Sequence, residues 1–380
     1  MESQTPLTIS AEYGLIDQNK FFGKRIAAKD LSNYYLIQKG EFAYNKSTSN
    51  DAPWGAIKRL DCYNNGALST LYIVFKIKDN KSCYSDFLVT YYGTSLWHKG
   101  VKEIATEGAR NHGLLNVSPS DFFRTKLVIP QDFEEQRKIG AFFTQLDNTI
   151  TLQQRKLNSL QKLKKGLLQK MFPKKGENIP EIRFPEFSDA WKQRKLGDIL
   201  KLLKDGTHGS HKDVTNGHYL LSAKNIKDGR IFWDKTDRII SDEDYKKIHS
   251  TFKINKGDVL LTIVGSIGET AIFNVSEEIT FQRSVAILRP IDEVSSDFLY
   301  SEITSPKFQK FLNLNKSTSA QPGIYLGDLA NISFSFPENK EEQKMIGRLF
   351  TGLNSTITLQ QRKLESLQKL KKGLLQQMFI

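Results

Sequence analysis

A long segment of this sequence occurs twice. Residues 134–172 read EEQRKIGAFFTQLDNTITLQQRKLNSLQKLKKGLLQKMF, and residues 341–379 read EEQKMIGRLFTGLNSTITLQQRKLESLQKLKKGLLQQMF, so that 30 of 39 positions are identical. The constant offset of 207 residues is too long for a solenoid repeat. The sequence therefore predicts a duplicated two-part unit, in which a variable globular segment is followed by a fixed segment.

The fixed segment has the heptad pattern of a coiled-coil helix. Steps of four and three residues alternate along ten positions, mostly apolar: Ile139, Phe143, Leu146, Ile150, Gln153, Leu157, Leu160, Lys164, Leu167 and Met171. Asp132 is the expected N-cap, with Glu135 three residues later, and Asn339 and Glu342 repeat this signal. We expect Pro173 to stop the first helix and the two helices to pack on each other in antiparallel orientation.

Polar residues in these helices allow two interpretations each. Gln153 and Gln360 occupy matched seam positions, where they either fix the register or are tolerated polar breaks. Between residues 148 and 176 there is no acid but there are eight basic residues: Arg155, Lys156, Lys162, Lys164, Lys165, Lys170, Lys174 and Lys175. Such a run is either a solvated face or a contact surface for phosphate or a protein partner.

The two variable segments look like divergent copies of one β-rich domain. Four stretches correspond in order: LTISA (7–11) with LLSAK (220–224), KGEFAY (39–44) with KGDVLL (256–261), ARNHG (109–113) with SAQPG (319–323), and KLVIP (126–130) with SFSFP (333–337). IVFKI, DVLLTIV and SVAILRP are expected strands, whereas TSLWHKGVKEIA and DFLYSEITSPKFQKFLN are expected short helices.

Only the second copy has a long stretch before its first matching strand. We call residues 179–199, IPEIRFPEFSDAWKQRKLGDI, the opening segment. In the first half, six residues precede LTISA. Alignment of the halves predicts that about thirty residues are missing there, as in a truncated or alternative-start product.

Charge and composition restrict the class of protein. The net charge of +13 favours a polyanionic partner, although a solvated basic surface is the plain alternative. Cys62 and Cys83 form no C-x-x-C pair, so we expect two buried free thiols in a reducing cytosol. The sequence shows no signal peptide and no run of 18 apolar residues, which predicts a cytoplasmic protein without a membrane contact.

The sequence shows no motif of a common catalytic site. It contains neither a methyltransferase-like N-P-P-Y or D-P-P-Y tetrapeptide nor a P-loop, and we interpret VGSIGET (264–270) as a strand turn. His208 and His211 lie three residues apart without flanking cysteines, so no metal site is expected. DEDYK (242–246) resembles an acidic nuclease cluster, but such clusters are common on surfaces. The chain reads as a binder with no catalytic residue.

These residues together resemble the specificity (S) subunit of type I restriction-modification systems. The matching motifs are FPEFSDAWKQRKLGDI at the start of a domain, DGTH (205–208), KGD (256–258), EEQ-x-x-IG at the start of each helix, and QQRKLxSLQKLKKGLLQ within it. The resemblance covers almost the whole chain, and the duplicated helix motif is its most specific part. The first domain departs from the family because it lacks the opening segment.

The resemblance implies an α+β fold with two β-rich target recognition domains, separated and joined by two long antiparallel coiled-coil helices in a pseudo-twofold duplication. The expected parts are the first target recognition domain at 1–131, the first helix at 132–173, the second domain at 174–338 and the second helix at 339–380. Each domain would read one half of a bipartite site in double-stranded DNA, and the helices would set the spacer between the half-sites.

The resemblance also implies partners. Two methyltransferase (M) subunits would dock on the helices and methylate adenine, and restriction (R) subunits would join them. S-adenosylmethionine, ATP and magnesium would be bound by those partner subunits, with no cofactor and no catalysis in this chain. The alternatives are a non-DNA coiled-coil assembly scaffold, a silent or truncated specificity cassette, and an enzyme such as a nuclease with an undetected site.

Loop composition suggests which residues contact DNA. Six loops are the best candidates: 42–50, 108–113, 205–212, 222–225, 281–284 and 317–323. Base contacts are expected from Arg110, Asn111, Lys46, Lys224, Asn225, Gln282, Arg283 and Gln321. Phosphate contacts are expected from Lys24, Arg59, Lys212 and Lys316. Surface solubilisation is the competing explanation for each lysine, and His208 either contacts DNA or holds its own loop.

Overall fold

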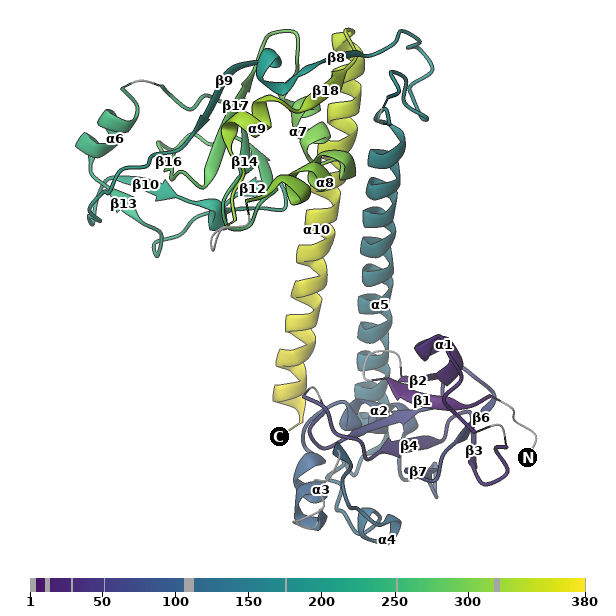
Figure 1. The fold of residues 1–380 in the computed structure, drawn as a ribbon. Helices are drawn as coiled ribbons and strands as arrows, with labels where there is room; N and C mark the ends of the chain where they lie inside the picture. Colours follow the sequence, from purple (N-terminus) through teal and green to yellow (C-terminus); the bar gives the residue numbers. More distant parts are fainter. Residues whose placement is uncertain are drawn as a thin grey trace. The chain divides into compact units, whose positions relative to one another are not determined.

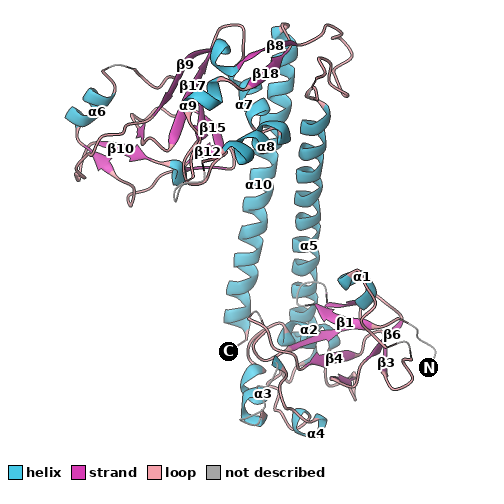
Figure 2. Ribbon diagram, in the orientation of Figure 1, coloured by secondary structure: helices cyan, strands magenta, loops and turns pink. Residues whose placement is uncertain are grey.

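The computed structural model describes residues 5–10, 14–28, 30–50, 52–105, 113–174, 176–250, 252–317 and 322–379. The chain forms two compact units, one of residues 1–152 with 364–380 and the other of residues 153–363 (Figure 1). Each unit combines a β-rich part, which we call its domain, with portions of both long helices. Helices and sheets are mixed throughout, as expected for an α+β fold (Figure 2).

The first domain contains three small sheets and several short helices. Its elements are β1 (Leu7–Ser10), β2 (Gly14–Asp17), α1 (Gln18–Phe22), β3 (Tyr35–Gln38), β4 (Phe42–Asn45), β5 (Ala56–Arg59), β6 (Asn65–Leu68), β7 (Tyr72–Phe75), α2 (Ser85–Tyr92), α3 (His98–Ile104) and α4 (Pro119–Phe122). The central sheet has the antiparallel order β5-β4-β7. An aromatic core that includes Phe42, Tyr44 and Phe122 packs this sheet against the helices.

The second domain repeats this plan with more strands. Its elements are β8 (Lys192–Lys195), η2 (Leu196–Ile199), β9 (Leu200–Asp205), β10 (His218–Leu221), η3 (Ala223–Asn225), β11 (Ile226–Lys227), β12 (Arg230–Ile231), β13 (Ile239–Ile240), α6 (Asp242–Ile248), β14 (Val259–Thr262), β15 (Thr270–Ile272), β16 (Thr280–Phe281), β17 (Val285–Pro290), α7 (Ser296–Ile303), α8 (Pro306–Asn315), α9 (Leu326–Ala330) and β18 (Ser333–Phe336). Its central sheet has the order β15-β14-β17-β9, so β9 adds a strand that has no counterpart beside β7 among the described residues.

The expected strands and helices of the variable segments are present. IVFKI, DVLLTIV and SVAILRP overlap β7, β14 and β17, and the expected helical stretches overlap α3, α7 and α8. VGSIGET forms the turn of the β14–β15 hairpin, where Gly265 and Gly268 adopt positive φ angles. Of the aligned pair KLVIP and SFSFP, only the second forms a strand in the described structure.

The duplicated segments form two long helices, α5 (Phe133–Lys170) and α10 (Lys340–Met378). All ten predicted seam residues of the first repeat, nine in α5 and Met171 just after it, are buried or half-buried. Within the first unit, Asp147 forms an ion pair with Lys371 and Phe143 packs near Phe379, so the helix portions there run antiparallel. The predicted coiled-coil packing is thus confirmed within this unit.

The second unit contains its own antiparallel contact between the helices. Phe172, just beyond α5, packs against Phe350 of α10 at a centroid distance of 5.8 Å. The matched residues Gln153 and Gln360 hydrogen-bond to each other through their side-chain amides. This pairing fits the register-fixing interpretation, because shifting one helix would leave two partly buried amides without partners.

The helix starts confirm part of the predicted capping. The Asp132 carboxylate accepts a hydrogen bond from the Glu134 backbone N–H, and the Asn339 side chain accepts one from Glu341. The second half of a capping box is not formed: Glu342 instead binds Arg183. The prediction of two buried thiols is also wrong, because Cys62 is exposed and Cys83 is only half-buried.

The repeated motif EEQ-x-x-IG joins each helix to its domain. The side chain of Gln136 accepts a hydrogen bond from the Tyr84 N–H and donates to the carbonyls of Ser82 and Pro130. Gln343 makes the equivalent bonds with Ser295 N–H and the carbonyls of Glu293 and Pro337. Both glutamines are buried, so each fully satisfies backbone groups that would otherwise lack partners.

The glycine of this motif permits close contact between elements. A Cβ atom on Gly140 would lie 2.6 Å from the Phe87 backbone nitrogen, and one on Gly347 would lie 2.5 Å from the Asp297 Cβ. Any larger residue would therefore push the long helix away from α2 or α7. Among the described helices, none is both long and apolar enough to cross a membrane.

Candidate nucleic-acid interface

Three of the predicted loops meet in the second domain because of the sheet topology. β10 runs parallel to β16, so residues 222–225 and 281–284 leave the sheet at the same edge. β9 ends at Asp205, opposite Ala286 near the start of β17, which brings loop 205–212 to this edge as well. The sequence placed DNA contacts in all three loops, and the structure brings the loops together.

Backbone hydrogen bonds hold these loops against one another. Thr207 N–H donates to the Phe281 carbonyl at 2.8 Å, and Arg283 N–H donates to the Thr207 carbonyl at 3.0 Å. The Gln282 N–H donates to the Leu221 carbonyl at 2.8 Å. At Gly206, a Cβ atom would lie 2.0 Å from the Phe281 carbonyl oxygen, so the close approach of the two loops requires glycine there.

A pocket of about 360 Å³ opens between the loops. Its lining consists of Thr207, His208, Gly209, Ser210, His211, Leu220, Arg238, Gln282 and Arg283. Arg283 is exposed, and no ion pair within the described part of the chain uses its guanidinium. The pocket therefore presents arginine and glutamine side chains, the donor and acceptor groups that read base edges in DNA.

The histidines of this pocket have different surroundings. The His208 Nε2 atom lies 2.6 Å from the Asp205 carboxylate, and its side chain is 63% exposed. His208 thus bonds to its own loop, as one of the two predicted roles requires, while its ring stays accessible. His211 is nearly buried, with Nε2 2.9 Å from the Thr207 hydroxyl and Nδ1 3.2 Å from the Asp244 carboxylate. It anchors the loop to α6.

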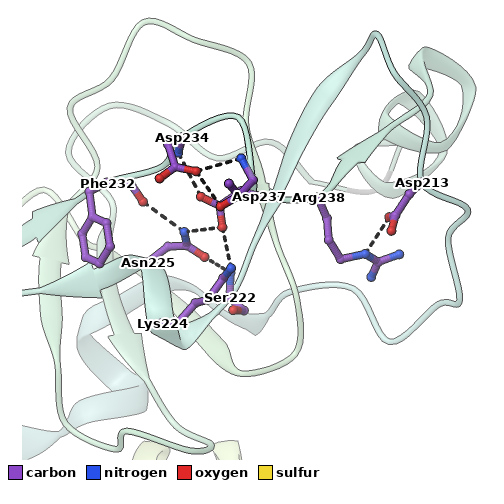
Figure 3. A network of polar contacts seen from close by, with 9 residues as sticks. Asp213, Ser222, Lys224, Asn225, Phe232, Asp234, Asp237 and Arg238 are labelled. Atoms are coloured by element: carbon purple, nitrogen blue, oxygen red, sulfur yellow. Dashed lines mark hydrogen bonds and ion pairs between the residues drawn. The ribbon is translucent and has the colours of Figure 1, made fainter.

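Arg238 is a pocket residue that the sequence reasoning missed. Its guanidinium donates to the Asp213 carboxylate at 2.7 Å (Figure 3). It also donates to the His211 carbonyl at 2.6 Å. It precedes β13, and pairing of β13 with β10 brings it to the pocket wall. No local motif announces this residue, because the strand pairing that positions it involves a segment some twenty residues away in the sequence.

The next predicted pair, Lys224 and Asn225, belongs to a polar network (Figure 3). Asn225 is buried, and its amide accepts from Ser222 N–H while donating to the Phe232 carbonyl and the Asp237 carboxylate. Lys224 forms a 2.8 Å ion pair with Asp237, although most of its side chain is exposed. This placement favours a loop-shaping role for Asn225 over the predicted base contact, whereas Lys224 remains accessible.

The network also determines the charge of Asp237. Burial disfavours the charged carboxylate, but hydrogen bonds from Asn225, Lys224 and the Asp234 backbone hold its pKa below the usual value. Asp237 is therefore ionised at neutral pH and keeps Lys224 fixed at the rim of the domain. Loop 222–225 is thus held beside the pocket by hydrogen bonds and an ion pair.

In the first domain, two of the predicted loops also lie side by side. The Thr48 N–H donates to the Gly113 carbonyl at 2.6 Å, and the Leu115 N–H donates to the Lys46 carbonyl at 3.0 Å. The Lys46 ammonium donates to the Val117 carbonyl at 3.3 Å. Loop 42–50 and the end of loop 108–113 thus share one surface, which corresponds to the meeting of loops in the second domain.

The remaining predicted residues have varied positions. Arg59 is largely buried and binds Asp61 and Asp86, which raises its pKa although burial acts in the opposite sense. It joins β5 to α2, a placement that favours a structural role over a phosphate contact. Lys24, Lys212 and Lys316 are exposed. Arg110, Asn111 and Gln321 lie outside the described residues.

Comparison with known proteins places the chain in a family. The family model of the type I restriction modification DNA specificity domain matches residues 22–162 and 188–369. The MjaVIII specificity subunit of Methanocaldococcus jannaschii is 25% identical over 307 residues, which cover 78% of this chain and 70% of that protein. The EcoBI specificity subunit of Escherichia coli is 26% identical over 173 residues, covering 44% of this chain and 35% of that protein.

A solved structure has the same fold. The S subunit of the type I restriction-modification system from M. genitalium matches with a TM-score of 0.60 at 15% identity, covering 90% of this chain and 84% of that one. The family model alone matches most of the chain, in two stretches that each contain part of a domain and part of a long helix. The chain therefore belongs to the family of type I restriction-modification specificity subunits.

Proposed function

We propose that this chain is the sequence-specific DNA-binding subunit of a type I restriction-modification complex. The convergence of loops 205–212 and 281–284 around one pocket, with loop 222–225 hydrogen-bonded beside them, is the observation that carries this proposal. The second domain reads one half of a bipartite target in double-stranded DNA through these loops. The first domain reads the other half through the surface that loop 42–50 shares with residues 113–117.

The chemistry of the pocket suits a DNA duplex. Arg283 can donate two hydrogen bonds to the O6 and N7 atoms of guanine, and Gln282 can form the bidentate pair with adenine. Exposed lysines, Lys212 among them, supply phosphate contacts and a salt-dependent affinity. The net charge of +13 favours the approach of such a polyanion.

The long helices offer two matched docking surfaces for protein partners. Leu152 and Leu359, at equivalent repeat positions, are each 62% exposed. Leu163 and Leu370 are also equivalent, at 51% and 52% exposure. Eleven residues separate the two leucines on each helix, which puts them on one face beside exposed basic residues. A solvated face would not need repeated exposed leucines, so we assign these faces to two methyltransferase subunits.

In the assembled complex, the helices set the spacer between the half-sites and restriction subunits join the methyltransferases. S-adenosylmethionine, ATP and magnesium are bound by these partners, so the chain itself contributes recognition rather than catalysis. Both the methyltransferase and the restriction subunits then depend on this chain to locate the target sequence in DNA.

Methylation of bipartite sites tests the proposal. The chain is co-purified with its methyltransferase subunits, incubated with genomic DNA and S-adenosylmethionine, and the methylated adenines are mapped by modification-aware sequencing. We expect one bipartite motif. Arg283→Ala should relax one base of that motif at a cost of roughly 1–3 kcal/mol in binding. The matched control Arg194→Ala changes an exposed arginine of β8 and should leave the motif intact.

Two outcomes would contradict the proposal. An assembled complex that methylates no site would identify a silent cassette, and binding to duplex DNA that does not weaken with rising salt would favour a protein scaffold. The docking faces are tested separately, because the double variant Leu152→Glu, Leu163→Glu should reduce the co-purified methyltransferase from two subunits to one. Unchanged stoichiometry would refute the assignment of these faces.

A further inference from the structure

The opening segment donates hydrogen bonds to a buried acid, Glu342, in the second unit. Both carboxylate oxygens of Glu342 accept hydrogen bonds from the Arg183 guanidinium, at 2.7 and 2.8 Å. The Trp191 indole N–H lies 3.3 Å from the same carboxylate. The Glu342 side chain is 0% exposed, so the bidentate arginine compensates the cost of burying its charge.

Glu135 occupies the equivalent position in the first unit without such a partner. It precedes Gln136, whose hydrogen bonds match those of Gln343 one by one, so the two acids occupy the same position next to equivalent joints. Yet Glu135 is exposed, and no hydrogen bond or ion pair of its carboxylate occurs among the described residues. The described part of the first unit therefore presents the acceptor of an arginine but no arginine bound to it.

A strand next to this acid differs between the units in the same way. In the second unit, β8 of the opening segment pairs with β18 through four residue pairs, and Phe334 and Ser335 are buried. The equivalent residues of the first unit, Leu127 and Val128, are 37% and 76% exposed. Within the described part of the first unit, no strand pairs with residues 126–129.

The edge of the central sheet shows a third difference of this kind, because a strand covers it in the second unit but not in the described part of the first. β17 is covered on its outer edge by β9, which directly follows the opening segment. β7, in the same place of the first sheet, pairs only with β4 among the described strands. Phe123, near this edge, packs on Phe75 and is 60% exposed. An unpaired strand edge beside exposed apolar side chains is a template for an added strand.

We propose that Glu135, residues 126–129 and the free edge of β7 form a docking site for a peptide segment with the chemistry of residues 181–205. Such a segment supplies an arginine for Glu135, a tryptophan beside it, a strand for residues 126–129 and a second strand for β7. The occupant is argued from the duplicate site of this same chain, where three matched contacts are occupied by one continuous segment. The inference concerns the completion of the fold and does not depend on DNA reading.

A synthetic peptide of residues 178–205 tests the proposal. The labelled peptide is titrated with the full chain and binding is followed by fluorescence anisotropy. We expect one peptide per chain, with binding weakened about tenfold or more by Glu135→Gln in the chain or by Arg183→Ala in the peptide. The matched control Glu134→Gln changes the neighbouring exposed acid, which pairs with Arg137, and should leave binding unchanged.

Hydrogen exchange locates the bound peptide and separates the outcomes. Protection should appear at residues 126–129 and β7, while the amides of residues 333–336 keep the exchange rates that they have in the free chain. Protection confined to 333–336 would mean that the peptide replaces the chain's own opening segment, which overturns the proposal. Absence of binding, binding that ignores Glu135→Gln, or a Glu135-dependent dimer of the chain without peptide would overturn it as well.

Discussion

The two domains differ most at the sheet edge that β9 covers in the second domain. There the central sheet has four strands, and the opening segment continues the coverage to Glu342. In the first domain the corresponding sheet has three described strands, and apolar side chains such as Val128 and Phe123 are exposed. The duplicated joint between helix and domain is nevertheless the same in both units. The joint therefore forms without the opening segment, whereas the covered edge requires it.

The largest expected difference in stability concerns the two equivalent acids, Glu342 and Glu135. Arg183→Ala leaves the Glu342 charge buried without compensation, which should destabilise the second unit by about 3–5 kcal/mol. Glu135→Ala removes an exposed, unpaired acid and should change the first unit by less than about 0.5 kcal/mol. Hydrogen exchange of the α7 and α2 amides measures both effects. Equal losses would contradict the contrast between a buried, paired Glu342 and an exposed, unpaired Glu135.

Replacing the buried glutamine of the joint should destabilise both units equally. Gln136→Ala and Gln343→Ala each leave one backbone N–H and two carbonyl groups without a buried partner, so each should cost roughly 1–3 kcal/mol. The same exchange experiment measures them. Exposed Gln145 and Gln368 on the same helices serve as controls, because their replacement by alanine removes no buried hydrogen bond. A clearly smaller loss for Gln136 would show that the first joint is weaker than its geometry suggests.

A pH dependence should distinguish the units. Burial raises the pKa of Glu302 in α7 to about 8, whereas Tyr91 occupies the equivalent place in α2. Because the folded-state pKa exceeds the unfolded one, stability is fully present below the unfolded pKa and is lost as the pH rises toward 8. The slope is at most roughly 1.4 kcal/mol per pH unit. Glu302→Gln should flatten this loss in chemical denaturation, and a persistent slope would assign it to another group.

The smallest effect is expected at the exposed strand of the first domain. Val128→Thr should change the stability of the free chain by no more than about 0.5 kcal/mol, because the side chain is 76% exposed. Its equivalent, Ser335, is buried, so Ser335→Thr serves as the sensitive counterpart. Thermal denaturation compares the two variants. A large destabilisation by Val128→Thr would show that some other part of the protein covers residues 126–129.

The repeat predicted the long helices well because their signals are local. Heptad spacing and the N-caps Asp132 and Asn339 act within a few residues, and both are present in the structure. The aligned strand pairs, such as KGEFAY with KGDVLL, were predictable for the same reason. Glu342 was misassigned to a capping box because its actual partner, Arg183, is 159 residues away in the sequence.

The candidate site was predicted less completely. Loop composition indicated the three loops that meet at one edge of the second domain, but not which side chains face outward. Asn225 turns inward because Phe232 and Asp237 offer it partners, and Arg59 because Asp86 does. Arg238 reaches the pocket only through the pairing of β10 with β13. Each of these positions depends on contacts between distant segments, which residue types alone do not reveal.

The joint made by Gln136 and Gln343 has a consequence for how such chains can vary. The hydrogen-bond partners of both glutamines on the domain side are backbone atoms: an amide N–H at the start of α2 or α7, and two carbonyl groups. Every residue supplies the carbonyl groups, and every residue except proline supplies the N–H, whatever side chains the loops carry. A domain with entirely different loops can thus be exchanged onto the same helix, provided that its backbone follows the same path. The helix therefore offers the same hydrogen-bonding groups to any domain whose backbone follows this path, and the connection tolerates changes in the rest of the domain.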